Sequence, residues 1–254
     1  MTLQEHASSH DTEPASHPLL ASSDSPVFFE ETSIEISKVG QTTVRSADQS
    51  ADWLVNVTLA VRSIVGSHAP TVTIAILELH ISSGALSVGS IKASSTSASV
   101  VHASFIVPEG VPERWYPHNL GTPRLYNFTI SLELAEGARV SFTARSGFRT
   151  VELVQTAYPA AELAARGITP GDQWHFAVNG KAFYTLGTNI IPFDPFYARM
   201  TTAQVRWVLE SAVQSGQNMV RPVACAHRKR AVVAYCSTHS CACGAEGYTS
   251  RRTN

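Results

Sequence analysis

Two segments alternate apolar and polar residues with a period of two, which constrains the fold more than any other feature of the sequence. In residues 53–61 the apolar side chains occupy the odd positions: Trp53, Val55, Val57, Leu59 and Val61. In residues 125–134 they occupy the even positions: Tyr126, Phe128, Ile130, Leu132 and Leu134. Successive side chains of a strand point to opposite faces of a sheet. The alternation therefore predicts two strands, each with one buried face.

Further β-rich runs lie at residues 70–81, 99–107 and 148–156, separated by clusters of Gly, Pro and Ser. The first is apolar on both faces, as in a central strand of a sheet. Short patterned strands with this punctuation are typical of an antiparallel sandwich. We therefore predict a β-sandwich over residues 27–157, preceded by a flexible N-terminal segment, residues 1–26, that is rich in Ser, Pro and His.

The pattern changes in residues 158–221. An Ala-rich run near 158–167 indicates a short helix, and Asn179-Gly180 between two alternating runs indicates a hairpin with a type I′ turn. Residues 201–216 carry an apolar stripe at helical spacing, with Thr201 or Thr202 to cap the start and Gly216 to end the helix. A strand at 217–221 completes one βαβ unit, which favours a parallel sheet. A (β/α)8 barrel needs about 250 residues, so this segment begins such a barrel and does not complete it.

Composition and charge exclude several classes of protein. The 44% of hydrophobic residues argue against disorder throughout, and a formal net charge of −1 argues against a nucleic-acid-binding protein. No apolar run is long enough to cross a membrane, so no membrane partner is expected. The first 26 residues lack the basic and apolar regions of a signal peptide.

Residues 222–254 form an irregular tail that holds all four cysteines of the chain: Cys225, Cys236, Cys241 and Cys243. With His227 and His239 they offer six soft metal ligands, but the spacing matches no common zinc motif, and no metal or other cofactor is expected. The short basic run at 228–230 indicates a solvated patch rather than a nucleic-acid site. We interpret the tail as sequence from a retained intron or a shifted reading frame.

Four segments carry a resemblance to a known family: RWYPHNLGTPRLYNFTISL at 114–132, GFRTVELVQ at 147–155, FAVNGKAFYTLGTNIIPFDPFYARMT at 176–201 and QNMVR at 217–221. Together they resemble the β-mannosidases of glycoside hydrolase family two, particularly the fungal secreted type. The resemblance implies a mainly β fold, with an immunoglobulin-like β-sandwich followed by the first βαβ unit of a truncated (β/α)8 barrel. It also implies a retaining hydrolase of terminal β-D-mannose residues, with a β-mannoside oligosaccharide or glycan as substrate.

The resemblance assigns roles to three residues. Asp194 and Asn189 match positions that bind substrate, and Arg221 matches a residue that holds the carboxylate of the nucleophile. The alternatives are a loop acid that caps the following helix for Asp194, a turn residue for Asn189 and a solvated side chain for Arg221. Where the family continues with Val-Trp after the second barrel strand, this chain has Pro222-Val223-Ala224.

Retaining glycosidases use two carboxyl groups about 5–5.5 Å apart. The candidates in the barrel-like part are Asp172, Asp194 and Glu210, and only Asp194 follows a barrel strand, where active-site residues collect. One carboxylate is not a pair, so no residue is predicted to be catalytic and the chain as written is expected to be inactive. The alternatives are a non-catalytic immunoglobulin-like module that binds carbohydrate or has a structural role, and a product that never accumulates.

Two N-glycosylation sequons begin at Asn56 and Asn127, each on the polar face of its predicted strand. They fit a secreted, extracellular relative. Four tryptophans could offer platforms for sugar stacking. Trp53 and Trp207 are instead predicted to lie in the core, and Trp115 to pack between domains.

Overall fold

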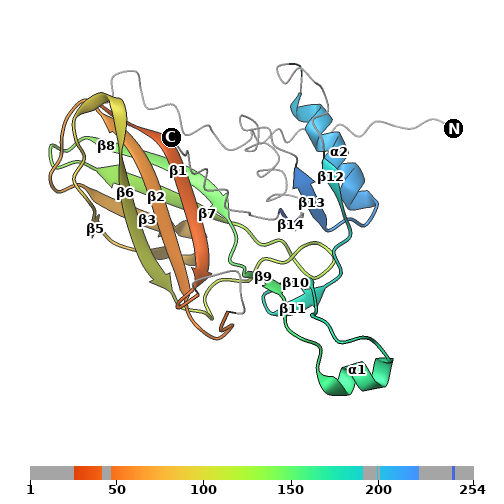
Figure 1. Ribbon diagram of the computed structural model, residues 1–254. Coiled ribbons are helices and arrows are strands. Elements are labelled where there is room, and N and C mark those ends of the chain that lie inside the picture. The colour runs from red at the N-terminus through yellow and green to blue at the C-terminus, as the bar shows by residue number, and fades with distance from the viewer. Residues whose placement is uncertain (1–25, 42–46, 191–198, 200, 223–241, 244–254) are drawn as a thin grey trace, which may run out of the picture.

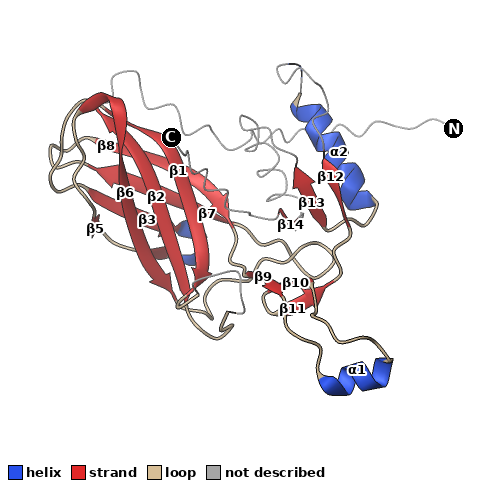
Figure 2. Ribbon diagram, viewed as in Figure 1, coloured by secondary structure: helices blue, strands red, loops and turns tan. Residues whose placement is uncertain are grey.

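The computed structural model describes residues 26–41, 47–190, 199, 201–222 and 242–243. It is mainly β, as predicted (Figure 2). The first half contains β1 (Val27–Lys38), β2 (Trp53–Ser63), β3 (Thr71–Ile76), β4 (Ile81–Ser82), β5 (Leu86–Ser87), β6 (Ser94–Val107), β7 (Tyr126–Glu133) and β8 (Arg139–Ser146). The second half contains β9 (Val151–Val154), α1 (Ala160–Arg166), β10 (His175–Val178), β11 (Lys181–Phe183), β12 (Gly187–Ile190), α2 (Thr202–Gln214), β13 (Met219–Pro222) and β14 (Ala242–Cys243).

The first eight strands form two antiparallel sheets. One has the order β1-β2-β6, and the other has the order β4-β3-β7-β8, with β5 also paired to β3. Figure 1 shows the two sheets stacked face to face. The division of the long strands, with β1, β2 and β6 in one sheet and β3, β7 and β8 in the other, is that of an immunoglobulin-like sandwich. The predicted fold class is thereby confirmed for this part of the chain.

The period-two segments form the two central strands and supply the core. In β2 the residues at odd positions from Trp53 to Val61 are at most 1% exposed, and in β7 Phe128 and Ile130 are fully buried. Phe148, from the loop after β8, lies among Trp53, Tyr126 and Phe128, with its ring centroid 5.5 Å from that of Trp53. This aromatic cluster closes one end of the space between the sheets.

The prediction of one long strand over residues 70–81 is wrong. The strand β3 ends at Ile76, a single 3-10 turn follows over Leu77–Leu79, and His80 has a left-handed backbone with φ of 54°. The chain then reverses, so that Ile81 pairs with Ile76. Leu77 is 68% exposed. The apolar run therefore contains a turn, and Leu77 of this turn is exposed to solvent.

The segment after the sandwich forms a second, smaller sheet with the order β11-β10-β9. Its strand β9 comes from the run predicted at 148–156, but it pairs with β10 rather than with a strand of the sandwich. The β10–β11 hairpin turns at Asn179 and Gly180, with φ of 51° and 74°. Positive φ at both positions defines the predicted type I′ turn, which is thereby confirmed. The predicted domain boundary at residue 157 stays a prediction.

Hydrogen bonds attach this small sheet to the sandwich. The buried side chain of Asn179 accepts a hydrogen bond from the backbone N–H of Thr150 at 2.9 Å and donates one to the carbonyl oxygen of Trp115 at 2.9 Å. Gln49, from the segment before β2, donates from Nε2 to Thr150 Oγ1 at 3.0 Å and to Glu152 Oε1 at 2.9 Å. The hairpin turn is thereby fixed against the same end of the sandwich that Phe148 closes.

The last described elements form a βαβ unit. The strands β12 and β13 are parallel, α2 connects them, and the two-residue strand β14 adds to β13 on its other side. Thr201 caps α2 by accepting a hydrogen bond from Gln204 N at 3.2 Å, while Gln204 Oε1 accepts one from Thr201 N at 2.8 Å. Val205, Leu209 and Ala212 are buried, which confirms the predicted apolar stripe. The rest of the tail lies outside the described residues.

A cluster of charged groups lies at the same end of the sandwich, beneath the attachment points. The side chain of Lys38 is fully buried, with Nζ 3.7 Å from the ring centroid of Trp53 and 2.7 Å from the carbonyl oxygen of Ala51. It forms an ion pair with Glu109, which also accepts a hydrogen bond from Arg114 Nε at 3.0 Å. Burial lowers the pKa of Lys38, although the hydrogen bond to Glu109 acts in the opposite direction.

We expect Glu109→Gln to lower the free energy of unfolding by about 3 kcal/mol, because it removes the ion-pair partner of the buried Lys38 ammonium. Urea denaturation at neutral pH measures the change. Glu30→Gln is the matched control, since it removes the exposed ion pair with Arg62 and should cost less than about 1 kcal/mol. Equal losses in the two variants would show that the buried cluster contributes no more than an exposed pair.

Candidate functional site

The β12–β13 pair carries two of the three residues predicted to bind substrate. Their register places Asn189 opposite Arg221 and Gly187 opposite Met219. The side chain of Asn189 is exposed. Asp194 lies outside the described residues, and only the backbone of Arg221 is described. The fold thus brings the strand segments that carry Asn189 and Arg221 side by side, although these two residues are 32 positions apart in sequence.

Two groups hold these strands in position. The first is the buried side chain of Asn218, which accepts a hydrogen bond from Leu186 N at 3.0 Å and donates one to Tyr184 O at 2.9 Å. The second is Gly187, where an added Cβ would lie 2.3 Å from the carbonyl oxygen of Met219. A Cβ does not fit at that distance. Sequence reasoning missed both positions, although Asn218 stands in the QNMVR segment and Gly187 in the LGTN segment.

Two of the three acidic residues considered for catalysis, Asp172 and Glu210, do not lie at these strands. Glu210 lies on the exposed side of α2, and Asp172 is an exposed residue before β10 whose backbone bridges to Ala157. Neither lies at the carboxyl end of β12 or β13, where a barrel enzyme places its catalytic groups. In residues 26–41, 47–190, 199 and 201–222, no three His, Cys, Asp or Glu side chains are placed to hold a metal ion. The cysteine cluster of the tail lies outside the side chains described.

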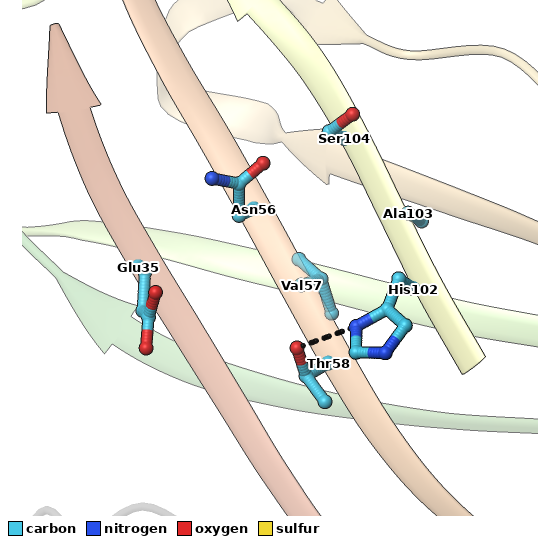
Figure 3. A pocket seen from close by; sticks show the side chains of 7 residues that line it. All are labelled: Glu35, Asn56, Val57, Thr58, His102, Ala103 and Ser104. Carbon is cyan, nitrogen blue, oxygen red and sulfur yellow. Dashed lines mark hydrogen bonds between the residues drawn. The ribbon is translucent and has the colours of Figure 1, made fainter. Parts of the chain in front are cut away.

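The sandwich carries a separate polar hollow of about 280 Å³ on the outer face of the β1-β2-β6 sheet (Figure 3). It is lined by Glu35, Asn56, Val57, Thr58, His102, Ala103 and Ser104. The ring nitrogen Nδ1 of His102 lies 3.0 Å from Thr58 Oγ1 in a hydrogen bond. Asn56, the first residue of a sequon, is half-buried beside this pair. The hollow has no aromatic platform for a sugar ring.

The second sequon has a different environment. Asn127 is exposed on β7, and both its backbone N–H and its Nδ2 donate to Glu78 Oε1, at 3.0 and 2.6 Å. Burial works against the ionised form of Glu78, but hydrogen bonds from its own backbone N–H and from Asn127 outweigh it and hold the pKa of the carboxyl below its usual range. One hydrogen of Asn127 Nδ2 remains outside this contact, so the amide can still carry a glycan.

The tryptophans divide into buried and exposed pairs. Trp53 is fully buried in the sandwich, as predicted, and Trp115 is fully buried against Val178 of β10, with the guanidinium of Arg149 4.1 Å from its ring centroid. Trp207 is 70% exposed on α2, so the prediction that it belongs to the core is wrong. It lies next to the buried stripe in sequence but on the opposite side of the helix, away from Val205 and Leu209.

Among the described residues, no helix has the length and apolar content needed to span a bilayer.

Comparison with curated proteins gives a consistent family of relatives. The chain is 36% identical over 198 residues to β-mannosidase A of Aspergillus aculeatus, and 36% identical over 196 residues to β-mannosidase A of Aspergillus oryzae. These alignments cover 77% and 75% of this chain. The chain is a homologue of the β-mannosidases. It spans 21% of the length of each of these two relatives. No family model matches the chain.

Solved structures agree on the fold of this β-mannosidase homologue. A β-D-mannosidase from Dictyoglomus thermophilum aligns with a TM-score of 0.57 at 17% identity, over 86% of this chain and 24% of that one. A family-two β-galacturonidase from Eisenbergiella tayi aligns with a TM-score of 0.59 at 16% identity, over 86% of this chain and 33% of that one. At this identity the likeness concerns the fold. It extends over the sandwich and beyond it, since it covers most of the chain.

We expect Gly187→Ala to disrupt the β12–β13 pair, because the new methyl group would collide with the backbone of Met219. Hydrogen exchange should show faster exchange in residues 187–190 and 219–221, with the exchange of β2 and β7 unchanged. Gly171→Ala is the matched control, since an added Cβ there meets no atom within 4 Å. Unchanged exchange at β12 and β13 in Gly187→Ala would contradict the close approach.

Proposed function

We propose that this chain is part of a β-mannosidase-type glycoside hydrolase that removes terminal β-D-mannose residues with retention of configuration. The observation that carries the proposal is the parallel β12–β13 pair. There Asn189 stands opposite Arg221, within the two segments that resemble the start of the family barrel. The identity to fungal β-mannosidases over the same part of the chain supports this proposal.

The proposed roles follow from the chemistry of each group. The carboxylate of Asp194 accepts two hydrogen bonds from sugar hydroxyls and so fixes the orientation of the sugar, and the amide of Asn189 both donates and accepts. The guanidinium of Arg221 holds the carboxylate of a nucleophile in its ionised form by charge-assisted hydrogen bonds. These three groups bind and position; none of them is a catalytic acid or nucleophile.

The catalytic step needs two carboxyl groups about 5–5.5 Å apart, one protonated and one ionised. In the described part of the chain, Asp172 and Glu210 lie away from the ends of β12 and β13. The catalytic pair is therefore proposed to come from barrel strands beyond those described. The 254 residues alone are proposed to bind β-mannosides weakly or not at all and to leave them intact.

We expect the purified 254-residue chain to release no aglycone from an aryl β-mannoside, because the described residues hold no carboxyl pair placed to protonate the leaving group and attack the sugar. Release of the aryl group measures activity, with a fungal β-mannosidase as the positive control. Turnover by the pure chain would contradict the proposed inactivity. Binding of mannosides in calorimetry without turnover would favour the alternative, a non-catalytic carbohydrate-binding module.

The mass of the native protein distinguishes a product of 254 residues from a complete hydrolase that contains them. An antibody to residues 50–150 would recover the protein from its source for intact mass measurement. A species of 27.4 kDa after removal of any N-linked glycans would identify the short chain as the product, and interest would move to binding. A species several times heavier would support the proposal that these residues belong to a complete hydrolase.

We also propose that the protein is extracellular and carries N-linked glycans at Asn56 and Asn127. Both side chains lie on the outside of the sandwich, half-buried and exposed respectively. Treatment of the native protein with a peptide N-glycosidase should lower its mass and convert each modified Asn to Asp. Replacement of Asn56 by Gln should remove one of the two glycans, with Asn119→Gln, which lies outside any sequon, as the control. An unchanged mass would overturn both sites.

A further inference from the structure

The polar hollow on the β1-β2-β6 sheet is crossed by a row of three side chains, one from each strand. The register places Asn56 of β2 directly opposite Glu35 of β1 and Ser104 of β6. Side chains directly opposite each other in an antiparallel pair are close enough to interact. Within the described part of the chain, however, none of these three side chains has a hydrogen-bond or ion-pair partner. A carboxylate, an amide and a hydroxyl therefore line the hollow and are available to a ligand (Figure 3).

The adjacent row adds a further donor to this lining. His102 Nδ1 and Thr58 Oγ1 share a hydrogen bond of 3.0 Å. Where Nδ1 accepts the hydrogen of the Thr58 hydroxyl, Nε2 carries the ring hydrogen and can donate a hydrogen bond to a ligand. The hollow measures about 280 Å³. At about 30 Å³ for each water molecule, this is room for roughly nine waters, which is the space of one sugar residue and not of an oligosaccharide.

A free sugar would bind weakly in this hollow, because the lining carboxylate of Glu35 is exposed to solvent and no aromatic ring is present for stacking. A sugar that is covalently attached beside the hollow binds under different conditions. The attachment makes binding intramolecular, with an effective concentration in the millimolar range, so a few hydrogen bonds are enough to hold the sugar in place. Asn56, which lines the hollow, is the first residue of the sequon at residues 56–58.

We propose that the hollow binds the first N-acetylglucosamine of an N-linked glycan on Asn56, an inference that rests on the glycosylation proposed above. The carboxylate of Glu35 accepts hydrogen bonds from sugar hydroxyls or from the acetamido N–H, and Ser104 and His102 donate to the acetamido carbonyl oxygen. Because the Asn56 amide has no partner among the described residues, the sugar replaces one of its hydrogens without loss of a contact to them. The bound sugar thereby connects β1, β2 and β6 on the outer face and stabilises the sheet.

The second sequon lacks these features and provides an internal comparison. Asn127 is exposed on β7, and its Nδ2 donates to Glu78 Oε1 at 2.6 Å. It is not among the residues that line the hollow. A glycan on Asn127 therefore extends into solvent, and its first sugar gains no comparable contacts with the sheet.

The test compares one polypeptide with and without a single sugar. Asn127→Gln is produced in yeast with a secretion leader and trimmed by an endoglycosidase, which leaves one N-acetylglucosamine on Asn56; the same variant from bacteria carries no sugar. We expect the sugar to raise the Tm by about 3 °C, the shift that one or two added hydrogen bonds give in a chain of this size. Asn56→Gln, prepared in the same two ways with its sugar on Asn127, is the matched control and should shift by less than about 1 °C.

A second pair of variants locates the sugar in the hollow. In the Asn127→Gln background, Glu35→Ala should remove at least about half of the sugar-dependent Tm shift, because one acceptor of the lining is lost. Glu31→Ala should leave the shift unchanged. Glu31 is exposed on the same strand, about 13 Å from Glu35, and does not line the hollow. Each variant is compared with its own sugar-free form, so its direct effect on stability cancels.

The outcomes separate this inference from the glycosylation on which it rests. Absence of the sugar from Asn56 by peptide mass mapping would overturn both. A sugar on Asn56 with no change in Tm would overturn the binding in the hollow and leave the glycosylation standing. A Tm shift that persists in full in Glu35→Ala would place the sugar outside the hollow and would also overturn the inference.

Discussion

The buried side-chain amide of Asn179 connects the β-sandwich to the small β11-β10-β9 sheet, and the βαβ unit follows that sheet in the chain. It accepts a hydrogen bond from Thr150 and donates one to Trp115, so one turn residue contacts the segments on both sides of the β7–β8 hairpin. Each of these backbone groups would otherwise be buried without a partner, which costs about 1–3 kcal/mol. This contact fixes the position of the β10–β11 hairpin. Only three residues separate the end of β11 from the start of β12, so the position of β12 depends on the same contact.

A second set of contacts strengthens the same junction. Gln49 contacts Arg114 of the charged cluster through its Oε1 at 2.9 Å and Glu152 of β9 through its Nε2. A neutral amide therefore connects a cation of the sandwich with an anion of the small sheet. At the centre of the cluster, Trp53 lies below both Lys38 and Arg114. Ion pairs in such a place specify geometry more than they add stability, because burial of charge carries a desolvation cost.

The described residues form only part of the proposed substrate-binding site. The βαβ unit supplies two adjacent strands, a capped helix and the register between Asn189 and Arg221. A barrel active site is assembled from the ends of several strands, so two strands give only part of it. The contacts that are present concern the position of the backbone. Asn218 and Gly187 set the distance between β12 and β13, and any substrate-binding side chain on these strands depends on that distance for its position.

The strands β2 and β7, the Asn179-Gly180 turn and the helix α2 could all be predicted from the sequence, because each is specified by local periodicity or by a turn residue. The resemblance to β-mannosidases was also visible in the sequence, because the segments around residues 114–132 and 176–201 are long and specific. The folded structure was needed to show that β3 ends at Ile76, that Trp207 faces solvent and that β9 pairs outside the sandwich. The structure was also needed to find the hydrogen bonds of Asn179 and Asn218 and the buried ion pair of Lys38. Local patterns record which residues are apolar, whereas burial, strand pairing and hydrogen-bond partners depend on groups that are distant in sequence and meet only in the folded chain.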